Sequence, residues 1–269
     1  MLQRNTPALE TYDVLGVPIS AVSLDFASQA IRLWAKDGIG RYVCVRDVHG
    51  VMQARRNLAL RAIHGDGAMV VPDGMPLVWL GWRAGHAVER TTGTDLMEVV
   101  VSSSTPSGLR HYFYGGRPGV AETLKRRFET RAPGVAVVGT ESPPFHDLSA
   151  EEIRAVADRI TSSGAHVVWI GLSTPKQEFL MRRLVDLVPA TLVGVGAAFD
   201  FLSGTIPRAP LWMQRGGLEW LHRLSQEPRR LWKRYLVLGP QFVVLATWQE
   251  VRRTWLDRSP RSSQGAVDG

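Results

Sequence analysis

The sequence predicts an α/β protein with a Rossmann-like parallel sheet and helices on both faces of that sheet. Short apolar runs rich in β-branched and aromatic residues alternate with amphipathic helical patterns. The runs are continuously apolar rather than alternating, which is typical of strands buried on both faces. Between about residues 106 and 200 the order is strand, helix, strand, helix, strand, helix, strand, as in a Rossmann-like half.

The apolar runs predict six strands, at residues 41–48, 68–71, 111–114, 135–138, 166–170 and 191–195. Helices are expected near Met75 and over residues 118–131, where apolar residues recur every four positions before a Pro-Gly stop. Ser149 begins a Ser-Ala-Glu-Glu capping pattern that predicts another helix start. Thr174 is expected to cap a further helix whose first turn holds Pro175.

The domain organisation follows from these elements. We expect an α/β core over residues 1–215, made of two intimate α/β halves, about 1–105 and 106–215, that meet at the Ser-rich stretch 102–107. Residues 216–258 are basic and aromatic and predict a helical basic C-terminal appendage. The polar tail 259–269 is expected to be disordered.

Composition narrows the function. The chain has 269 residues and a net charge of +7, and most of the excess lies from Arg208 onward, which favours anionic partners. The single cysteine, Cys44, excludes an internal disulfide and a cysteine-cluster metal site. It lies in an apolar run, so we interpret it as a buried, unreactive thiol.

The sequence predicts a cytoplasmic protein. We find no secretory signal pattern, and the best candidate membrane span, residues 235–248, contains Gly239 and Pro240 and is shorter than the roughly 20 residues needed. The C-terminal third combines arginines with tryptophans, and such a surface favours an anionic membrane. The alternative is that these helices simply dock on the core. We expect peripheral association with the inner face of the plasma membrane.

Several short motifs carry a family resemblance. They occur in a fixed order between residues 14 and 240, and only their combination is specific: Pro72-Asp-Gly74, Glu89-Arg90 with Gly93 and Asp95, Gly115-Gly116, Pro175-Lys-Gln-Glu178, Gly194 to Asp200, Arg208-Ala-Pro210, and Glu219-Trp220 through Arg230. The chain resembles the bacterial WecG/TagA/CpsF glycosyltransferases. The resemblance implies transfer of a hexose from a UDP-sugar to a polyprenyl-diphosphate-linked saccharide in cell-surface or exopolysaccharide biosynthesis. It also implies inversion at the anomeric carbon, without metal or other cofactor.

The resemblance assigns the catalytic roles. Asp73, in a turn after the strand at 68–71, corresponds to the family's proposed base; the alternative is that it only caps the helix near Met75. Arg223 and Arg230 match the arginines that the family places over the diphosphate, and Lys233 stands where an arginine is common. Arg90, in a loop, is a further candidate for the leaving diphosphate. No Asp-x-Asp motif is present, so arginines replace a metal in this interpretation.

Substrate binding is expected at the loops after the strands at 166–170 and 191–195. The helix start that contains Lys176 and Gln177 favours an anion, and Asp200 is placed to accept from ribose or base. For Lys176 and Glu178 an ordinary solvent-facing first turn explains the residues equally well. Asp47 stands where many family members carry the asparagine of a Thr-x-Asn pair, and Val45 replaces the threonine. We therefore expect Asp47 to bind substrate and the donor hexose to differ from N-acetylmannosamine.

Two other functions fit less of the sequence. An NAD-dependent oxidoreductase requires Gly-x-Gly-x-x-Gly after a first strand, and the sequence from Gly194 breaks this pattern at its third glycine. A non-catalytic basic module that binds nucleic acid is suggested by charge alone, without a zinc, helix-turn-helix or RNP motif. No nucleic-acid partner is expected. The oligomeric state stays open, with a homo-oligomer as one option.

Overall fold

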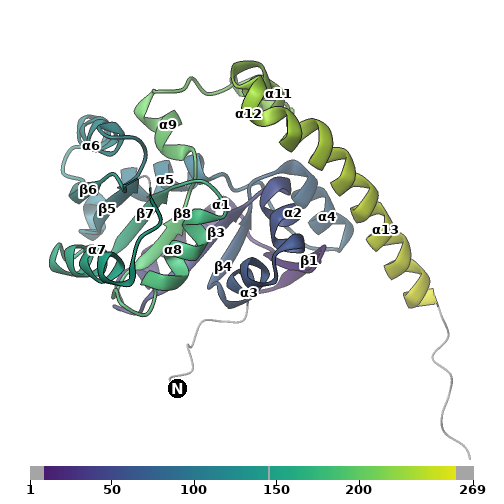
Figure 1. Cartoon of the computed structure of the whole chain (residues 1–269), viewed down its shortest axis with the longest axis horizontal. Coiled ribbons are helices and arrows are strands. Elements are labelled where there is room, and N and C mark those ends of the chain that lie inside the picture. The colour runs from purple at the N-terminus through teal and green to yellow at the C-terminus, as the bar shows by residue number, and fades with distance from the viewer. Residues whose placement is uncertain (1–8, 145, 259–269) are drawn as a thin grey trace, which may run out of the picture.

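A single six-stranded parallel sheet forms the centre of the molecule (Figure 1). The computed structural model describes residues 9–144 and 146–258, so the predicted tail at 259–269 lies outside the described residues. The strand order is β4-β3-β8-β7-β5-β6. The strands are β3 (Arg41–Arg46), β4 (Met69–Pro72), β5 (Arg110–Gly115), β6 (Ala136–Glu141), β7 (Val167–Gly171) and β8 (Thr191–Gly194).

All six strands predicted from apolar runs are confirmed, and so is the Rossmann-like fold class. The prediction for β3 ran two residues too far. Asp47 leaves the strand and becomes the N-cap of the next helix, because its Oδ1 accepts a hydrogen bond from the Gly50 N–H at 2.9 Å. The capping box predicted at Ser149 is present, with Ser149 and Glu152 hydrogen-bonded to each other's backbone N–H groups.

Helices cover both faces of the sheet. Successive strand residues point to opposite faces, so Cys44 belongs to one apolar core while Val43 and Val45 belong to the other. The first core is closed by α2 (Val48–Arg56), α3 (Leu58–Asp66), α7 (Ala150–Ser162) and α8 (Lys176–Leu184). The second is closed by α1 (Leu24–Trp34), α5 (Gly93–Ser102), α6 (Val120–Arg131) and α9 (Ala198–Ser203), and a short turn, η1 (Thr105–Ser107), joins α5 to β5.

A hairpin not expected from the sequence lies beside β4. Its strands β1 (Thr11–Val14) and β2 (Val17–Ser20) pair antiparallel around Leu15 and Gly16, which both adopt positive φ, 54° and 85°. The Ser20 hydroxyl accepts from the Val70 N–H at 3.0 Å and so attaches the hairpin to the sheet edge. The helix expected near Met75 is α4 (Met75–Arg83), and it packs against the hairpin.

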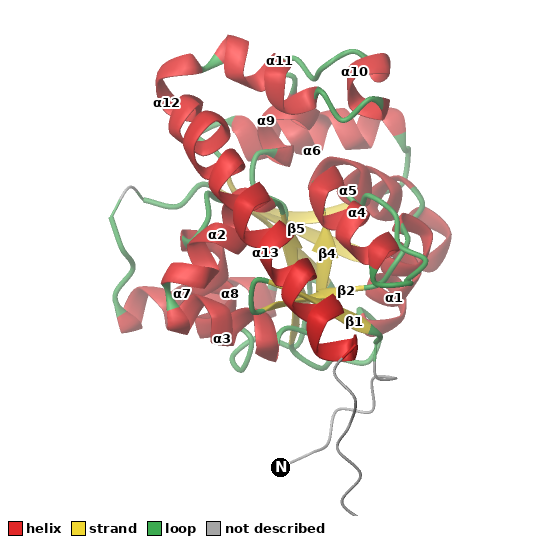
Figure 2. Cartoon of the chain, turned by 90° about the vertical axis from the view of Figure 1, so that its right-hand side faces the viewer, coloured by secondary structure: helices red, strands yellow, loops and turns green. Residues whose placement is uncertain are grey.

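The C-terminal appendage is helical, and it docks on the core rather than standing apart. Its helices are α10 (Leu211–Arg215), α11 (Glu219–Gln226), α12 (Pro228–Trp232), the π-helical η2 (Lys233–Leu238) and α13 (Gly239–Arg258). The helix α13 crosses in front of the sheet edge and the β1–β2 hairpin (Figure 2). Phe242 and Ala246 are buried in the first core, and Gln249 hydrogen-bonds the backbone of Asp13 and Leu15.

Candidate active site

Two topological switch points lie at the carboxyl ends of the parallel strands, and the regions outside them are named the first and the second crevice. Strand β3 lies between β4 and β8, and β5 lies between β6 and β7, so the chain changes direction across the sheet at the β3–β8 and β5–β7 junctions. Ligands of open α/β sheets bind at such switch points, outside the carboxyl ends of the strands. Asp47 and Asp73 follow the strands at the first junction, and Gly115 and Gly171 end the strands at the second.

Asp73 lies at the end of β4, held by its backbone. Its N–H donates to the Arg46 carbonyl at 2.7 Å, and its own carbonyl accepts from Arg90 Nε at 2.7 Å. Gly74 is the N-cap residue of α4, so the alternative that Asp73 only caps this helix is wrong. The carboxylate is 4.0 Å from Arg90 Nη2, and 37% of the side chain is exposed in the crevice. The carboxylate is therefore accessible to a reactant.

The electrostatic setting of Asp73 suits proton abstraction. Burial raises the pKa of its carboxyl to about 6, and the neighbouring acids Asp47 and Glu219 add to the rise, while Arg90 and Arg223 oppose it. A base works best when its pKa lies near the working pH. At neutral pH Asp73 is mostly ionised and still basic enough to take a proton.

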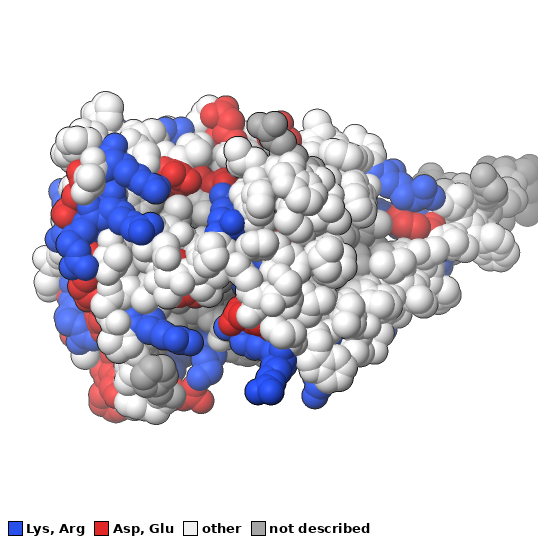
Figure 3. Space-filling view, turned by 90° about the horizontal axis from the view of Figure 1, so that it is seen from above, with Lys and Arg blue, Asp and Glu red and all other residues white. Residues whose placement is uncertain are grey.

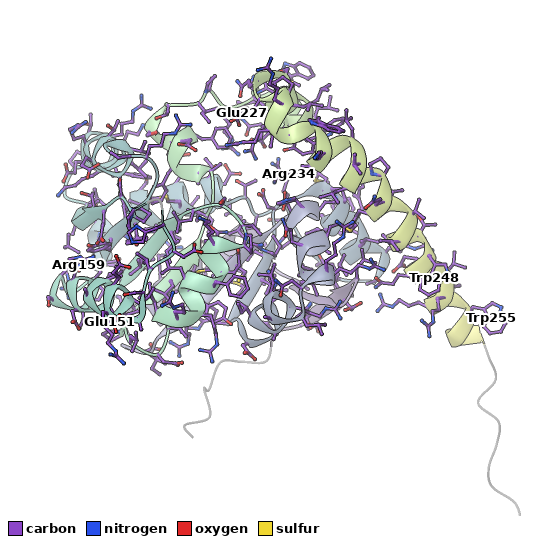
Figure 4. The ribbon with its side chains drawn as sticks, viewed as in Figure 1. Glu151, Arg159, Glu227, Arg234, Trp248 and Trp255 are labelled. Carbon is purple, nitrogen blue, oxygen red and sulfur yellow. The ribbon has the colours of Figure 1, made fainter. Side chains whose placement is uncertain are left out.

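Asp47 lies beside Asp73 and is paired with the appendage. Its Oδ2 contacts Arg234 Nη2, and burial, which alone would raise the pKa of Asp47, is outweighed by Arg234, His49 and the Gly50 N–H, so this pKa lies well below its usual range. Asp47 is thus ionised at neutral pH. The sequence did not single out Arg234, which Figure 4 shows on the side of the appendage that faces the core.

Lys233, the residue predicted to bind the diphosphate, lies exposed, with its ammonium 5.6 Å from the centre of the Trp232 ring. Lys233 and Arg234 both belong to the π-helical η2, whose wider turn changes which residue faces the core. The structure therefore brings Arg234, rather than Lys233, to the site. Lys233 as a substrate-binding residue stays a prediction.

Arg90 joins the appendage to the core next to Asp73. Its Nη1 donates to the Gln214 carbonyl at 3.1 Å, and its Nη2 pairs with Glu219 Oε2 at 2.5 Å. Glu219 Oε1 also lies 3.5 Å from Arg208 Nε, and Arg208 forms a two-bonded pair with Asp95 at 2.6 and 3.1 Å. The motif residues of the appendage thus build a chain of alternating charges that fixes α11 over the first crevice.

The two arginines predicted to act on the diphosphate both lie near Asp200. The Arg223 guanidinium lies 5.3 Å from the centre of the Phe201 ring, and Arg230 is largely exposed and pairs with Glu227 at 2.6 Å. Burial raises the pKa of Asp200, while Arg117, Arg230 and Arg223 act to lower it, so all three arginines approach this carboxylate.

Arg223 also acts on the pKa of Asp73, so this arginine lies between the two crevices. Sequence reasoning missed Arg117, although its place directly after Gly115-Gly116 pointed to it. A Cβ at Gly115 would lie 2.6–2.7 Å from the backbone of Gly171, so close strand packing explains this glycine.

The start of α8 differs from its prediction. The N-cap is Pro175, so the expectation that Thr174 caps this helix is wrong; the Thr174 hydroxyl instead lies 3.3 Å from Glu178 Oε1. Lys176 is exposed and lies 3.7 Å from Asp147, as in an ordinary first turn. Glu178 is fully buried, so the solvent-facing interpretation fails for it. Gln177 is also buried, and its Oε1 accepts from the Gly196 N–H at 3.0 Å.

The described residues contain no group of three His, Cys, Asp or Glu side chains arranged to hold a metal ion. Cys44 is buried as expected, and burial raises the pKa of its thiol to about 12, so it is not a nucleophile. Arginine side chains lie beside both acids of the first crevice, Arg90 beside Asp73 and Arg234 beside Asp47.

The appendage presents an apolar surface. Figure 3 shows a broad area with few charges over the appendage, whereas Lys and Arg gather on the side of α6. Exposed tryptophans along the appendage are Trp212, Trp220, Trp232, Trp248 and Trp255. Trp79 and Trp82, on α4, are also each more than half exposed. None of the helices in the described part of the chain combines the length and apolar character needed to cross a bilayer.

Comparison with known proteins agrees with this geometry. A family model described as "Glycosyl transferase WecG/TagA/CpsF family" matches residues 12–255. A curated protein of Bacillus spizizenii, named N-acetylglucosaminyldiphosphoundecaprenol N-acetyl-beta-D-mannosaminyltransferase, is 30% identical over 221 residues, which cover 81% of this chain and 83% of the relative. The match spans both crevices and most of the appendage, and the chain belongs to the WecG/TagA/CpsF family of glycosyl transferases.

Proposed function

We propose that this enzyme transfers a hexose from a UDP-sugar to a saccharide linked to polyprenyl diphosphate, with inversion at the anomeric carbon. The observation that carries this proposal is Asp73, an accessible carboxylate of raised pKa in a crevice surrounded by arginines. The name of the Bacillus relative supplies the acceptor class, a sugar-diphosphoundecaprenol. The oxidoreductase and nucleic-acid alternatives lack a comparable site.

In the proposed step Asp73 is the general base. An acceptor hydroxyl attacks the anomeric carbon of the donor from the face opposite UDP, and its proton passes to the Asp73 carboxylate. The new glycosidic C–O bond forms as the bond to the β-phosphate oxygen breaks, and UDP leaves with the electron pair. Because the attack occurs once and in line, the configuration at the anomeric carbon inverts.

Arginine side chains stabilise the leaving diphosphate in this proposal. Arg223 lies between the crevices, and Arg117 and Arg230 approach Asp200 at the second one. A fixed positive charge aimed at the oxygen where charge develops lowers the barrier without a metal. Lys176 and Lys233 are exposed point charges and contribute long-range attraction for UDP in this proposal. Arg90 already donates from each of its three nitrogens to a protein acceptor and mainly holds Glu219 and Asp73 in place.

The donor hexose is recognised, we propose, beside Asp47. Its ionised carboxylate accepts hydrogen bonds from sugar hydroxyls, and Arg234 keeps it charged. A carboxylate in this position favours a sugar with free hydroxyls over the N-acetyl group transferred by the Bacillus relative. Gln177 and Asp200 remain proposed contacts for the uridine.

Peripheral attachment to the inner face of the plasma membrane completes the proposal. The lipid-linked acceptor is anchored in a bilayer, and the appendage that carries the exposed tryptophans also carries Arg234, which pairs with Asp47 at the first crevice. Aromatic and basic side chains together suit an anionic bilayer surface. The test is sedimentation of the protein with anionic and with neutral liposomes, where the proposal requires preference for the anionic ones.

The decisive experiment is a panel of UDP-hexoses with a short-chain polyprenyl-diphosphate-N-acetylglucosamine acceptor, with products identified by mass spectrometry. One donor is expected to extend the acceptor by one hexose, and NMR of the product is expected to show an inverted anomeric centre. UDP is expected to raise the melting temperature, whereas NAD and an oligonucleotide are not. Stabilisation by NAD but not by UDP would refute the proposal.

A further inference from the structure

A fully buried ion pair lies beneath the two crevices. Arg46, the last residue of β3, and Glu178, in the first turn of α8, are 1% and 0% exposed, and Arg46 Nη2 contacts Glu178 Oε1. Burying two charges costs free energy that their mutual attraction often fails to recover. Such a pair needs an explanation other than stability.

The pair connects the two elements that carry the predicted nucleotide contacts. Glu178 Oε1 accepts from Gln177 Nε2 at 2.8 Å and lies 3.3 Å from the Thr174 hydroxyl, which in turn is 3.3 Å from Arg46 Nη1. Gln177 Oε1 accepts from the N–H of Gly196, in the loop after β8. One carboxylate oxygen therefore organises the start of α8 and, through Gln177, the β8 loop.

The same arginine belongs to the backbone that carries both carboxylates of the first crevice. Its carbonyl accepts the N–H of Asp73 at 2.7 Å, and Asp47 is the next residue along the chain. The space for its guanidinium depends on Gly50, because a Cβ there would lie 2.6 Å from Arg46 Nη1. Any shift of Arg46 is thus transmitted to Asp47 and Asp73.

The pair is not optimised for stability. Among the described residues, Arg46 Nε and Glu178 Oε2 are buried without a hydrogen-bond partner. A pair selected only to stabilise the fold would satisfy these atoms, because an unsatisfied buried polar group is costly.

On the basis of the transferase function proposed above, we propose that Arg46 and Glu178 are positioning residues that fix the spacing between the Asp73 base and the nucleotide loops. Neither side chain reaches a reactant, since both are buried below the crevices. Arg46 fixes the positions of Asp47 and Asp73, and Glu178 fixes the position of Gln177. The contact between Arg46 and Glu178 joins these two sides of the site. A displacement of about 1 Å between base and donor is enough to reduce turnover about 10²-fold.

The test separates positioning from folding. Arg46→Met or Glu178→Leu alone leaves an uncompensated buried charge and is expected to lower the melting temperature. The double variant Arg46→Met with Glu178→Leu replaces the pair by apolar groups and is expected to recover most of the melting temperature. Its kcat/KM for transfer is nevertheless expected to stay at least about tenfold below that of the parent, with weaker UDP binding by calorimetry. Recovery of both stability and kcat/KM would overturn the proposal.

A matched control lies at the other end of the same strand. Arg41, also buried, pairs with Asp37 at 2.7 Å at the amino end of β3. Arg41→Met is expected to lower the melting temperature without changing kcat/KM or UDP affinity.

If the double variant does not fold, the kcat/KM of Glu178→Gln tests the positioning role instead. This variant keeps the shape and an acceptor, and a loss of at least about tenfold in kcat/KM supports the proposal, while an unchanged value overturns it. Failure of the parent enzyme to bind UDP or transfer sugar would reject the proposed function itself. If the parent enzyme is active and the variants keep its kcat/KM, only the positioning role is rejected.

Discussion

Replacing Asp73 by asparagine removes the carboxylate at the end of β4 while keeping a side chain of the same size. An amide cannot accept the acceptor proton, so we expect kcat to fall by about 10²-fold or more. UDP affinity is expected to change little, because the contacts proposed for UDP lie at the second crevice. The assay is transfer to a saturating short-chain acceptor, combined with UDP calorimetry.

The pKa of Asp73 sets the magnitude of a second readout. With a pKa of about 6, the fraction ionised is about one tenth at pH 5 and about nine tenths at pH 7. The parent kcat/KM is therefore expected to rise about tenfold over this interval. An aspartate at its ordinary value of 3.8 would be more than about nine tenths ionised already at pH 5 and would give a flat profile.

The same shift predicts the effect on stability. A folded-state pKa above the unfolded value means that the folded protein holds this proton more tightly. That contribution is fully present below about pH 3.8 and is lost as the pH rises through about 6. The asparagine variant is neutral throughout, so its melting temperature relative to the parent is expected to increase from pH 4.5 to pH 7.5. A catalytic loss in a protein of equal or greater stability would identify chemistry rather than misfolding.

Asp66→Asn is the matched control, since this exposed aspartate ends α3 just before the amino end of β4, whereas both crevices lie at the carboxyl ends of the strands. It is expected to leave turnover and its pH profile unchanged. Near-parental turnover of Asp73→Asn, or a flat parental profile between pH 5 and pH 7, would refute the assignment of Asp73 as the base.

Three further outcomes are expected. Arg234→Ala leaves Asp47 without its cation and should reduce kcat/KM by about tenfold or more, whereas Lys233→Ala should change it less than about threefold; steady-state kinetics with equal effects would contradict the side-chain placement. Glu219→Gln leaves Arg90 and Arg208 without their shared carboxylate and should destabilise the fold by about 1–2 kcal/mol, measured by urea unfolding; no change would show that α11 is held by other contacts. Transfer should survive excess EDTA, and loss of activity that Mn²⁺ restores would reject the arginine-based account.

The strands were predictable because a strand that is buried on both faces has a continuous run of apolar residues in the sequence. The β1–β2 hairpin was missed because Gly16 and Pro18 interrupt its apolar stretch, and because a two-residue turn with Leu15 at positive φ has no strong sequence signature. Its residues depend on tertiary contact with β4 and α13 for their structure, and such contacts leave no local pattern.

The site was predictable at the strand ends and less so in the appendage. Asp47 and Asp73 follow recognisable strands, and the order of parallel strands places them together. Counting by ordinary helical spacing selected Lys233, but η2 is π-helical and Arg234 faces the core. The sequence left a solvent-facing first turn open for Glu178 and did not single out Arg46. Their burial depends on a contact between residues separated by more than 130 positions, which no local pattern encodes.

The place of β3 between β4 and β8 determines how this enzyme can be altered. Residues 41–44 pair directly with residues 191–194, so cutting the chain between the two predicted halves would expose two hydrogen-bonding edges and separate Arg46 from Glu178. A chimera that exchanges the C-terminal half with that of a relative must therefore exchange β3 and β8 together. The unit that evolution or an engineer can replace is the β3–β8 strand pair with the carboxyl ends of both strands, rather than either half of the sequence.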